Sequence, residues 1–150
     1  MWNRTMSTGG VFIYKCVASN TAGTGQSESV TVTVAESFNL IRRPADPTVV
    51  VEGVNSTQVH LVWNFTDCSS FAIIIDRERP DGSQNTRIAS RSGPTFNIFN
   101  SDYEANLPAT LVIKNVTRND EYVYVFAVFN TYNFKRELED SVAVEVLCKY

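Results

Sequence analysis

The chain is built from short segments in which apolar and polar residues alternate with a period of two. The clearest of these segments are Ser29–Val34, Val59–Phe65, Thr110–Lys114, Glu121–Phe129 and Asp140–Leu147. Valine, threonine and aromatic residues dominate them, as expected of residues that fit a pleated, half-buried strand. No long stretch carries a helical stripe, and turn signals separate the segments. Many short strands at this spacing predict an all-β sandwich or barrel.

A break in the pattern lies between residues 36 and 47. Pro44 and Pro47 cannot donate hydrogen bonds to a ladder, and the arginine pair before them suits a solvated link. We therefore expect two unequal parts, 1–37 and 38–150. The second part has about the size of one sandwich domain. The first offers two strands, and a lone hairpin is at best marginally stable in water.

The segment Tyr14–Gly23 carries tyrosine, cysteine, alanine, asparagine and glycine at positions 14, 16, 18, 20 and 23. This spacing resembles strand F and the F–G turn of an intermediate-type immunoglobulin domain, with Tyr14 as the tyrosine corner. The resemblance implies that Ser29–Val34 is strand G. It also implies that residues 1–37 are the C-terminal remnant of such a domain, with the disulfide partner of Cys16 upstream of residue 1.

A second resemblance to the immunoglobulin superfamily covers residues 38–150. The family's spacing through strand E, the E–F corner and strand F is matched by Leu111, Ile113, Asn115, Asp120 and Tyr124. Tyr124 is the tyrosine corner in this register. Phe126 then takes the strand F cysteine position, and Trp63 takes the partner position on strand B. The resemblance implies a Trp63–Phe126 contact in place of a bridge worth ~2–4 kcal/mol.

Three cysteines leave at least one thiol unpaired within the chain. In the implied register Cys68 lies in the B–C loop and Cys148 at the far end of strand G. A strand of about eight residues separates these ends by roughly 25 Å, whereas the Cα atoms of a disulfide lie within about 7 Å. We expect no Cys68–Cys148 bridge in this part of the chain. Both thiols are free, or they pair with other segments or chains.

Four N-glycosylation sequons begin at Asn3, Asn55, Asn64 and Asn115. A sequon marks an accessible asparagine only in a secreted chain, and four is barely more than this composition gives by chance. Asn64 alternates with Trp63 and is expected to face outward on strand B. Asn55 and Asn115 map to loops at the bottom of the domain. None of the four lies on strands C, F or G of the second part.

The sheet formed by those three strands is expected to be apolar on both faces. With Phe126 pointing inward, the outward set is Val123, Val125, Ala127 and Phe129, with Ala72, Ile74, Ala143 and Leu147. A sheet face in contact with water should carry polar residues, and a large exposed apolar patch marks a contact surface. The sequence therefore predicts protein recognition through the G–F–C face. Alternatively, a neighbouring domain or loop covers this face, or the register slips by one residue.

The loop 130–140 is expected to join strands F and G. It presents Tyr132, Phe134, Lys135 and Arg136. Aromatic and arginine side chains at loop tips are common interface anchors. The alternative is an ordinary solvated hairpin tip.

Charge and composition argue against several functions. With 13 basic and 16 acidic residues and no basic run, a nucleic-acid surface is not expected. One histidine and three cysteines exclude most metal and nucleophile chemistry, so we expect no enzyme, metal or cofactor. His60 should face solvent. The acidic residues, Asp140 among them, lack calcium-site spacing and are expected to be solvated. No apolar run can span a bilayer, and the start does not resemble a secretory signal.

Tandem domains of this kind resemble the ectodomains of adhesion molecules and immune-type receptors. The resemblance implies a module that binds proteins outside the cell or at its surface, beside neighbouring immunoglobulin domains. The partner would be a second copy or a different protein, and the anchor and signal would lie outside this chain. The alternative is an intracellular, muscle-type array of mechanical spacers. That alternative would explain the missing disulfide, because cytosolic thiols stay reduced, but it would leave the sequons without meaning.

Overall fold

The computed structural model describes residues 10–34, 38–53, 58–66, 71–131 and 133–148. Contacts divide the chain into two units, Met1–Ser37 and Phe38–Tyr150. Apart from one 3-10 turn, η1 (Arg118–Asp120), every regular element in the described residues is a strand. The all-β prediction is therefore confirmed.

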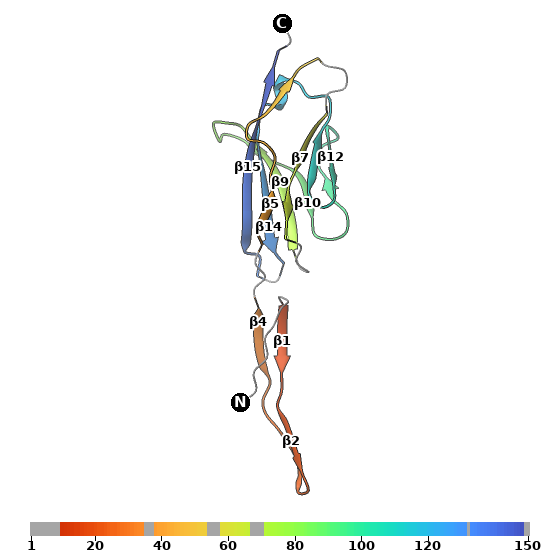
Figure 1. The fold of residues 1–150 in the computed structure, drawn as a ribbon, viewed down its shortest axis with the longest axis vertical. Helices are drawn as coiled ribbons and strands as arrows, with labels where there is room; N and C mark the ends of the chain where they lie inside the picture. The colour runs from red at the N-terminus through yellow and green to blue at the C-terminus, as the bar shows by residue number, and fades with distance from the viewer. Residues whose placement is uncertain (1–9, 35–37, 54–57, 67–70, 132, 149–150) are drawn as a thin grey trace. The chain divides into compact units, whose positions relative to one another are not determined.

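The first unit consists of short antiparallel ribbons (Figure 1). Its strands are β1 (Gly10–Tyr14), β2 (Val17–Asn20), β3 (Gly23–Gln26) and β4 (Val30–Val34). β1 pairs with β4, and β2 pairs with β3. Asn20 closes the β2–β3 turn, since its Oδ1 accepts the N–H groups of Ala22 and Gly23 at 2.8 and 3.1 Å. No described side chain of this unit is buried. Its assignment to a domain remnant, and that of Tyr14 to a tyrosine corner, stay predictions.

The second unit is made of two main sheets that face each other across one core, together with a two-stranded ladder of β5 and β8 (Figure 1). Its strands are β5 (Leu40–Arg42), β6 (Thr48–Val51), β7 (Val59–Val62), β8 (Asn64–Phe65), β9 (Phe71–Glu78), β10 (Asn85–Arg91), β11 (Asn97–Ile98), β12 (Tyr103–Asn106), β13 (Thr110–Ile113), β14 (Val123–Asn130) and β15 (Arg136–Leu147). The larger sheet has the order β11-β10-β9-β14-β15-β6, and the smaller has the order β12-β13-β7. β5 pairs with β8. Every pairing is antiparallel except that of β15 with β6.

Two features of this arrangement depart from the sequence prediction. β15 begins at Arg136, so the expected 130–140 loop is wrong and the connection is a tight turn. In that turn the Phe134 N–H donates to the Asn130 carbonyl, and the Asn130 N–H donates to the Lys135 carbonyl. Because β14 runs on to Asn130, it offers a ladder partner to the charged residues after the turn, and they extend the strand. The second departure is a set of strands that the sequence pattern did not indicate, namely β5, β6, β10, β11 and β12. β5 lies within the expected link 36–47 and is a strand because it pairs with β8.

The core contains the aromatic pair that the register implied. The rings of Trp63 and Phe126 stack with centroids 5.1 Å apart and planes 11° apart. Both side chains are fully buried. The ring centroid of Phe65, which belongs to the same core, lies 5.7 Å from that of Phe126. Stacked aromatic rings combine large apolar burial with a specific geometry. The two positions therefore contribute packing to the centre of the sandwich.

Asp140 is not the solvated charge that the sequence predicts. Its side chain is only 8% exposed and lies 3.2 Å from the Arg43 guanidinium. Its carboxylate also accepts the indole N–H of Trp63 at 2.8 Å. Arg43 binds the Asp46 carboxylate at 3.3 Å and the Ser141 carbonyl at 2.9 Å as well. A buried carboxylate is tolerated when donors satisfy it, and here those donors tie the segment between β5 and β6 to β15.

The E–F corner is fixed by a tyrosine and a capped turn. The Tyr124 hydroxyl donates to the Asp120 carbonyl at 3.2 Å. Burial raises the pKa of Tyr124 far above its ordinary value, so the hydroxyl stays protonated and remains a donor. Thr117 caps η1, and its N–H and hydroxyl both donate to the Asp120 carboxylate. This is the geometry expected of a tyrosine corner.

Candidate functional site

The candidate site is the outer face of β9, β14 and β15. Along β14 the inward side chains are fully buried, whereas Val123, Val125 and Phe129 stay partly exposed. Ile74 on β9 is also partly exposed. These four residues line one hollow of about 230 Å³ on that face. The structure therefore brings these four predicted residues together, whereas Ala72, Ala143 and Leu147 of the predicted outward set do not line this hollow.

Charged side chains narrow this apolar surface on both flanks. On β9, Val123 is opposite Glu78 and Val125 is opposite Asp76. On β15, Ala127 is opposite Glu139. Ala127 itself is only 3% exposed. The apolar part of the face is thus a row along β14 with Ile74 of β9 beside it, and acidic neighbours make it narrower than the patch that the sequence predicts.

Two of the acidic neighbours, Asp76 and Glu139, are paired with arginines, whereas Glu78 accepts a hydrogen bond from the Asn85 side-chain amide. On β10, Arg87 forms a two-pronged contact with Asp76, Nε to Oδ1 at 2.9 Å and Nη2 to Oδ2 at 3.3 Å. This hydrogen bond raises the pKa of the Arg87 guanidinium above its ordinary value. On β15, Arg136 pairs with Glu139 and lies 5.4 Å from the centre of the Phe129 ring. An apolar floor is therefore rimmed by matched charges.

The charged rim was not predicted from the sequence, although the residues of β9 contain a signal for it. Once the face is assigned, alternate positions on β9 read Ala72, Ile74, Asp76 and Glu78. The apolar character therefore ends halfway along that strand. The pairing of Arg87 could not be foreseen, because β10 itself was not predicted.

The predicted residues of the turn are separated from one another. Phe134 lies at the tip with 82% of its surface exposed and a positive φ of 54°. Arg136 belongs to β15 and lies on the face. Tyr132 lies outside the described residues. Phe134 is therefore the large apolar side chain that the described part of this turn exposes to solvent.

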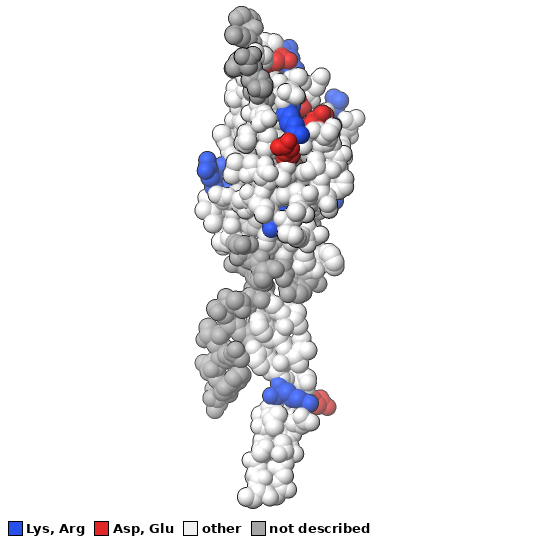
Figure 2. Space-filling view, turned by 90° about the vertical axis from the view of Figure 1, so that its right-hand side faces the viewer, with Lys and Arg blue, Asp and Glu red and all other residues white. Residues whose placement is uncertain are grey.

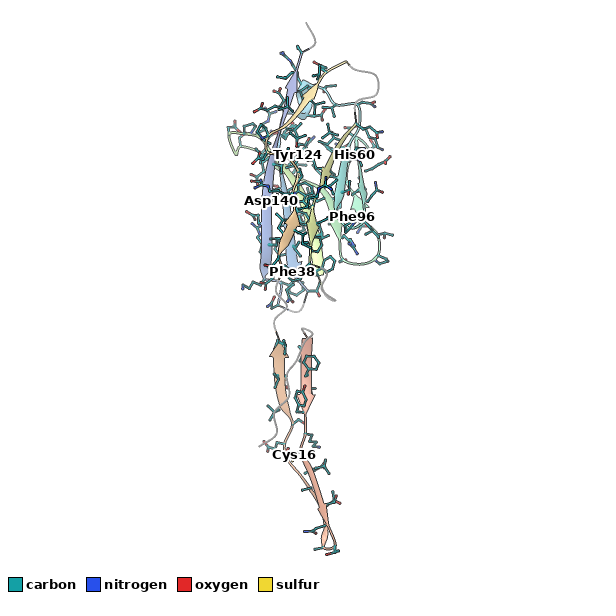
Figure 3. The ribbon with its side chains drawn as sticks, in the orientation of Figure 1. Cys16, Phe38, His60, Phe96, Tyr124 and Asp140 are labelled. Carbon is teal, nitrogen blue, oxygen red and sulfur yellow. The ribbon has the colours of Figure 1, made fainter. Side chains whose placement is uncertain are left out.

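The remaining predicted positions are scattered. Asn64 is half-buried in β8, Asn115 is exposed, and Asn3 and Asn55 lie outside the described residues. Cys16 and Cys148 are exposed free thiols, whereas Cys68 lies outside the described residues. His60 is exposed on β7, as expected (Figure 3).

Two kinds of feature are missing from the described part of the chain. No cluster of three or more His, Cys, Asp or Glu side chains in it is arranged to hold a metal ion. No helix in the same residues is long and apolar enough to cross a membrane. In the view of Figure 2, Lys and Arg do not gather into a patch, and several lie beside Asp or Glu. The ion pairs of the described residues include Lys114 and Glu104, whose Nζ and Oε1 atoms lie 2.9 Å apart.

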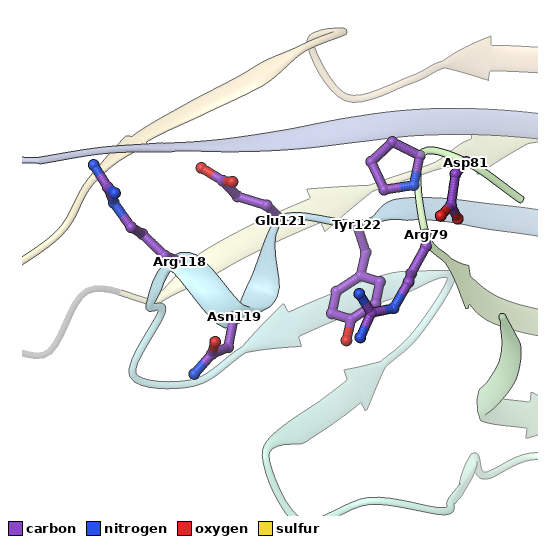
Figure 4. Close-up of a pocket in the computed structure, with 7 residues that line it drawn as sticks. Arg79, Asp81, Arg118, Asn119, Glu121 and Tyr122 are labelled. Atoms are coloured by element: carbon purple, nitrogen blue, oxygen red, sulfur yellow. The ribbon is translucent and has the colours of Figure 1, made fainter. Parts of the chain in front are cut away.

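A larger hollow of about 560 Å³ lies beside η1 (Figure 4). It is lined by Arg79, Pro80, Asp81, Arg118, Asn119, Glu121 and Tyr122. Figure 4 shows Arg118 and Glu121 toward one side and Asp81 at the other. Glu121 accepts the Val146 N–H at 3.1 Å, and Asp81 accepts the Ser83 N–H at 2.9 Å. Basic and acidic side chains alternate here, so no like charges converge on one ligand.

No protein-family model and no curated protein matches the sequence. Among solved structures, one of murine CRIg is similar, with a TM-score of 0.54 and 12% sequence identity. The match covers 77% of this chain and 100% of that chain. The fold is an immunoglobulin-like β-sandwich. At this identity the likeness shows the fold alone. Within it, β10 and β11 extend the larger sheet as the C′ and C″ strands do in variable-type domains.

Proposed function

We propose that the second unit is a protein-recognition module of an extracellular or cell-surface protein, and that it binds through the face of β9, β14 and β15. The supporting observation is the apolar row on β14 enclosed by the Arg87–Asp76 and Arg136–Glu139 pairs. Interfaces combine an apolar centre with a polar rim, and rim charges select partners and set orientation. A purely solvated face would not need Val125 and Phe129 at its centre.

The partner is a protein surface, either a second copy of this chain or another cell-surface protein. Phe134 extends the surface at the β14–β15 turn, where its exposed ring can enter a pocket of the partner. Adhesion between cells is the role that the resemblance implies for such a module. Neighbouring immunoglobulin-like domains would present it, and neither a cofactor nor a catalytic group takes part.

A second candidate function has one observation in its favour. The Trp63–Phe126 pair occupies the centre of the sandwich, and Cys16 and Cys148 are free thiols. A core that needs no disulfide suits a reducing compartment. On this alternative the unit is a mechanical spacer in an intracellular array, and its outer face binds nothing.

Substitution of Val125 distinguishes the recognition function from the spacer function. We compare the full wild-type chain with Val125→Asp and with the control Ile41→Asp, whose site on β5 is 69% exposed and belongs to the other side of the sandwich. The measurements are self-association by sedimentation velocity and binding of a multimerised chain to a panel of cells. Recognition predicts at least a tenfold loss of affinity for Val125→Asp, or ~1.4 kcal/mol, and no loss for Ile41→Asp.

Two results would refute the recognition function. One is undiminished association of a folded Val125→Asp chain, as judged by its circular dichroism. The other is a wild-type chain that neither self-associates nor binds any cell, which would leave the spacer as the function.

A further inference from the structure

We infer that Asn115 is the acceptor of an N-linked glycan whose first sugar lies in the adjoining polar hollow, and that Asn64 is not glycosylated in the folded protein. Both asparagines begin a sequon. The inference rests on the proposed function in one respect, which is entry into the secretory pathway. Its test supplies that step artificially and does not involve the recognition face.

Asn115 has the setting that a glycan requires. It lies after β13 and just before the capped turn η1, and its side chain is exposed. Its φ of 47° places it in the left-handed region, which asparagine tolerates better than most residues. A sugar attached here therefore displaces no strand.

A hollow of about 420 Å³ lies next to this asparagine. Its lining includes Ser101, Asp102, Lys114, Asn119 and Tyr122. The Arg77 guanidinium lies 4.7 Å from the centre of the Tyr122 ring and holds that side chain in place. Hydroxyl, amide and charged groups can replace the water that hydrates a sugar. The hollow is thus a surface of the right chemistry beside the attachment atom.

Asn64 has the same motif in a different setting. It pairs with Arg42 in the short β5–β8 ladder and is half-buried there. The N–H of Thr66 in this sequon donates to the Asn39 carbonyl, and its hydroxyl oxygen accepts the Asn39 N–H, both at 2.9 Å. The Thr117 hydroxyl of the other sequon is also hydrogen-bonded, to Asp120, so the two sites differ in the half-burial of Asn64 and in its pairing with β5. A sugar on Asn64 competes for space with β5, so folding selects against chains that carry it.

The two ends of the second unit then have different roles. The 3-10 turn η1 and the turn between β14 and β15 lie at opposite ends of the sandwich (Figure 1). A glycan at Asn115 is therefore remote from Phe134 and from the Phe129 end of the recognition face. It shields one end of the unit and leaves the other accessible.

The reaction is a transfer from an oligosaccharide carried on a polyprenyl pyrophosphate. The side-chain nitrogen of Asn115 forms a bond to C1 of the first sugar. The bond from C1 to the pyrophosphate oxygen breaks, polyprenyl pyrophosphate leaves, and the amide nitrogen loses one proton. No oxidant or reductant takes part.

Site mapping tests the acceptor. The full chain, placed behind a secretion signal, is secreted from animal cells and deglycosylated in heavy-oxygen water, which labels each former acceptor. We expect label at position 115 and none at position 64. Asn115→Gln should lose the mass of one glycan, Asn64→Gln should lose none, and Thr117→Ser should keep the glycan. The inference would be overturned if position 115 carried no label, or if position 64 carried label in the folded protein.

Val125→Asp should be glycosylated like the wild type. A failure of the proposed recognition face would therefore be seen separately from a failure of this inference.

Thermal unfolding tests the placement of the sugar. In a background with Asn3→Gln and Asn55→Gln, glycans are trimmed to the first sugar, and the product is compared with the same chain made in bacteria. The trimmed protein should unfold at the higher temperature. Equal midpoints would overturn the placement in the hollow.

Discussion

Val32 in β4 and Val142 in β15 are the same residue in the same kind of strand, yet one belongs to a ribbon and the other to a packed sandwich. Val32 is 36% exposed, whereas Val142 is fully buried. β4 reads Val-Thr-Val-Thr-Val and is as good a strand former as any segment in the chain. The two units therefore do not differ in local propensity. They differ in whether a second layer covers the strand.

The same contrast holds for aromatic residues. Phe12 and Tyr14 stack at 6.4 Å on the β1–β4 ribbon, where no described side chain is buried. Trp63 and Phe126 stack at 5.1 Å inside the second unit. Burial of apolar area is the main stabilising contribution to a domain. We therefore expect substitutions to have large effects in the second unit and small ones in the first.

The largest effect should follow Trp63→Ala. Truncation of a buried tryptophan leaves a cavity and should lower the free energy of unfolding by about 3–5 kcal/mol. It also removes the stacking partner of Phe126 and the indole donor of Asp140. Urea denaturation followed by circular dichroism measures the loss. Trp63→Phe, which keeps a ring in the core, should lose clearly less. A loss below about 1 kcal/mol for Trp63→Ala would contradict the expectation that core packing is the main contribution to the free energy of unfolding.

Asp140→Ala should rank second, with a loss of about 1–3 kcal/mol, because it leaves the buried indole N–H of Trp63 without its acceptor. The neighbouring Glu139→Ala is the control, since the Glu139 side chain is 45% exposed. Its loss should be within about 0.5 kcal/mol. Both are measured by chemical denaturation. Equal losses for the two variants would contradict the buried network.

A matched pair of valines tests the comparison directly. Val142→Ala removes two buried carbon groups worth about 0.8 kcal/mol each, and the cavity brings the loss to about 2 kcal/mol. Val32→Ala should change the main transition by less than about 0.5 kcal/mol. If both variants shift the denaturation midpoint equally, the ribbon is buried against another surface in solution.

Of these substitutions of buried side chains in the second unit, Tyr124→Phe should have the smallest effect. It deletes the hydroxyl that donates to Asp120 and keeps the buried ring, so the loss should be about 0.5–1.5 kcal/mol. Hydrogen exchange at the E–F corner should rise more than at β14. No change at the corner would show that the turn is held by the Thr117 cap alone.

The sequence was informative wherever one face of a strand is buried. On β14 the alternation placed Phe126 inside and Val125 outside, because a slip of one residue would reverse every side chain. The pairing of Trp63 with Phe126 followed from their positions in the resemblance. The burial of both rings required no long-range information beyond that register.

The predictions were wrong where contacts with residues distant in the sequence determine the burial of a side chain or the formation of a strand. Asp140 carries a charge in a polar stretch, and only the approach of Trp63 and Arg43 from other segments makes it a buried acceptor. β10 reads Asn-Thr-Arg-Ile-Ala-Ser-Arg, with no alternation, and becomes a strand because β9 offers it a ladder. The charged rim of the recognition face was missed for the same reason.

The stacked indole of Trp63 also makes the interior of the second unit visible to spectroscopy. A tryptophan fixed against a ring and hydrogen-bonded to a carboxylate has one asymmetric environment, which gives near-ultraviolet circular dichroism and shielded fluorescence. Loss of tight packing abolishes the near-ultraviolet signal even when strands persist. The near-ultraviolet circular dichroism of the native chain therefore measures, without any added dye, whether its two sheets are still packed together.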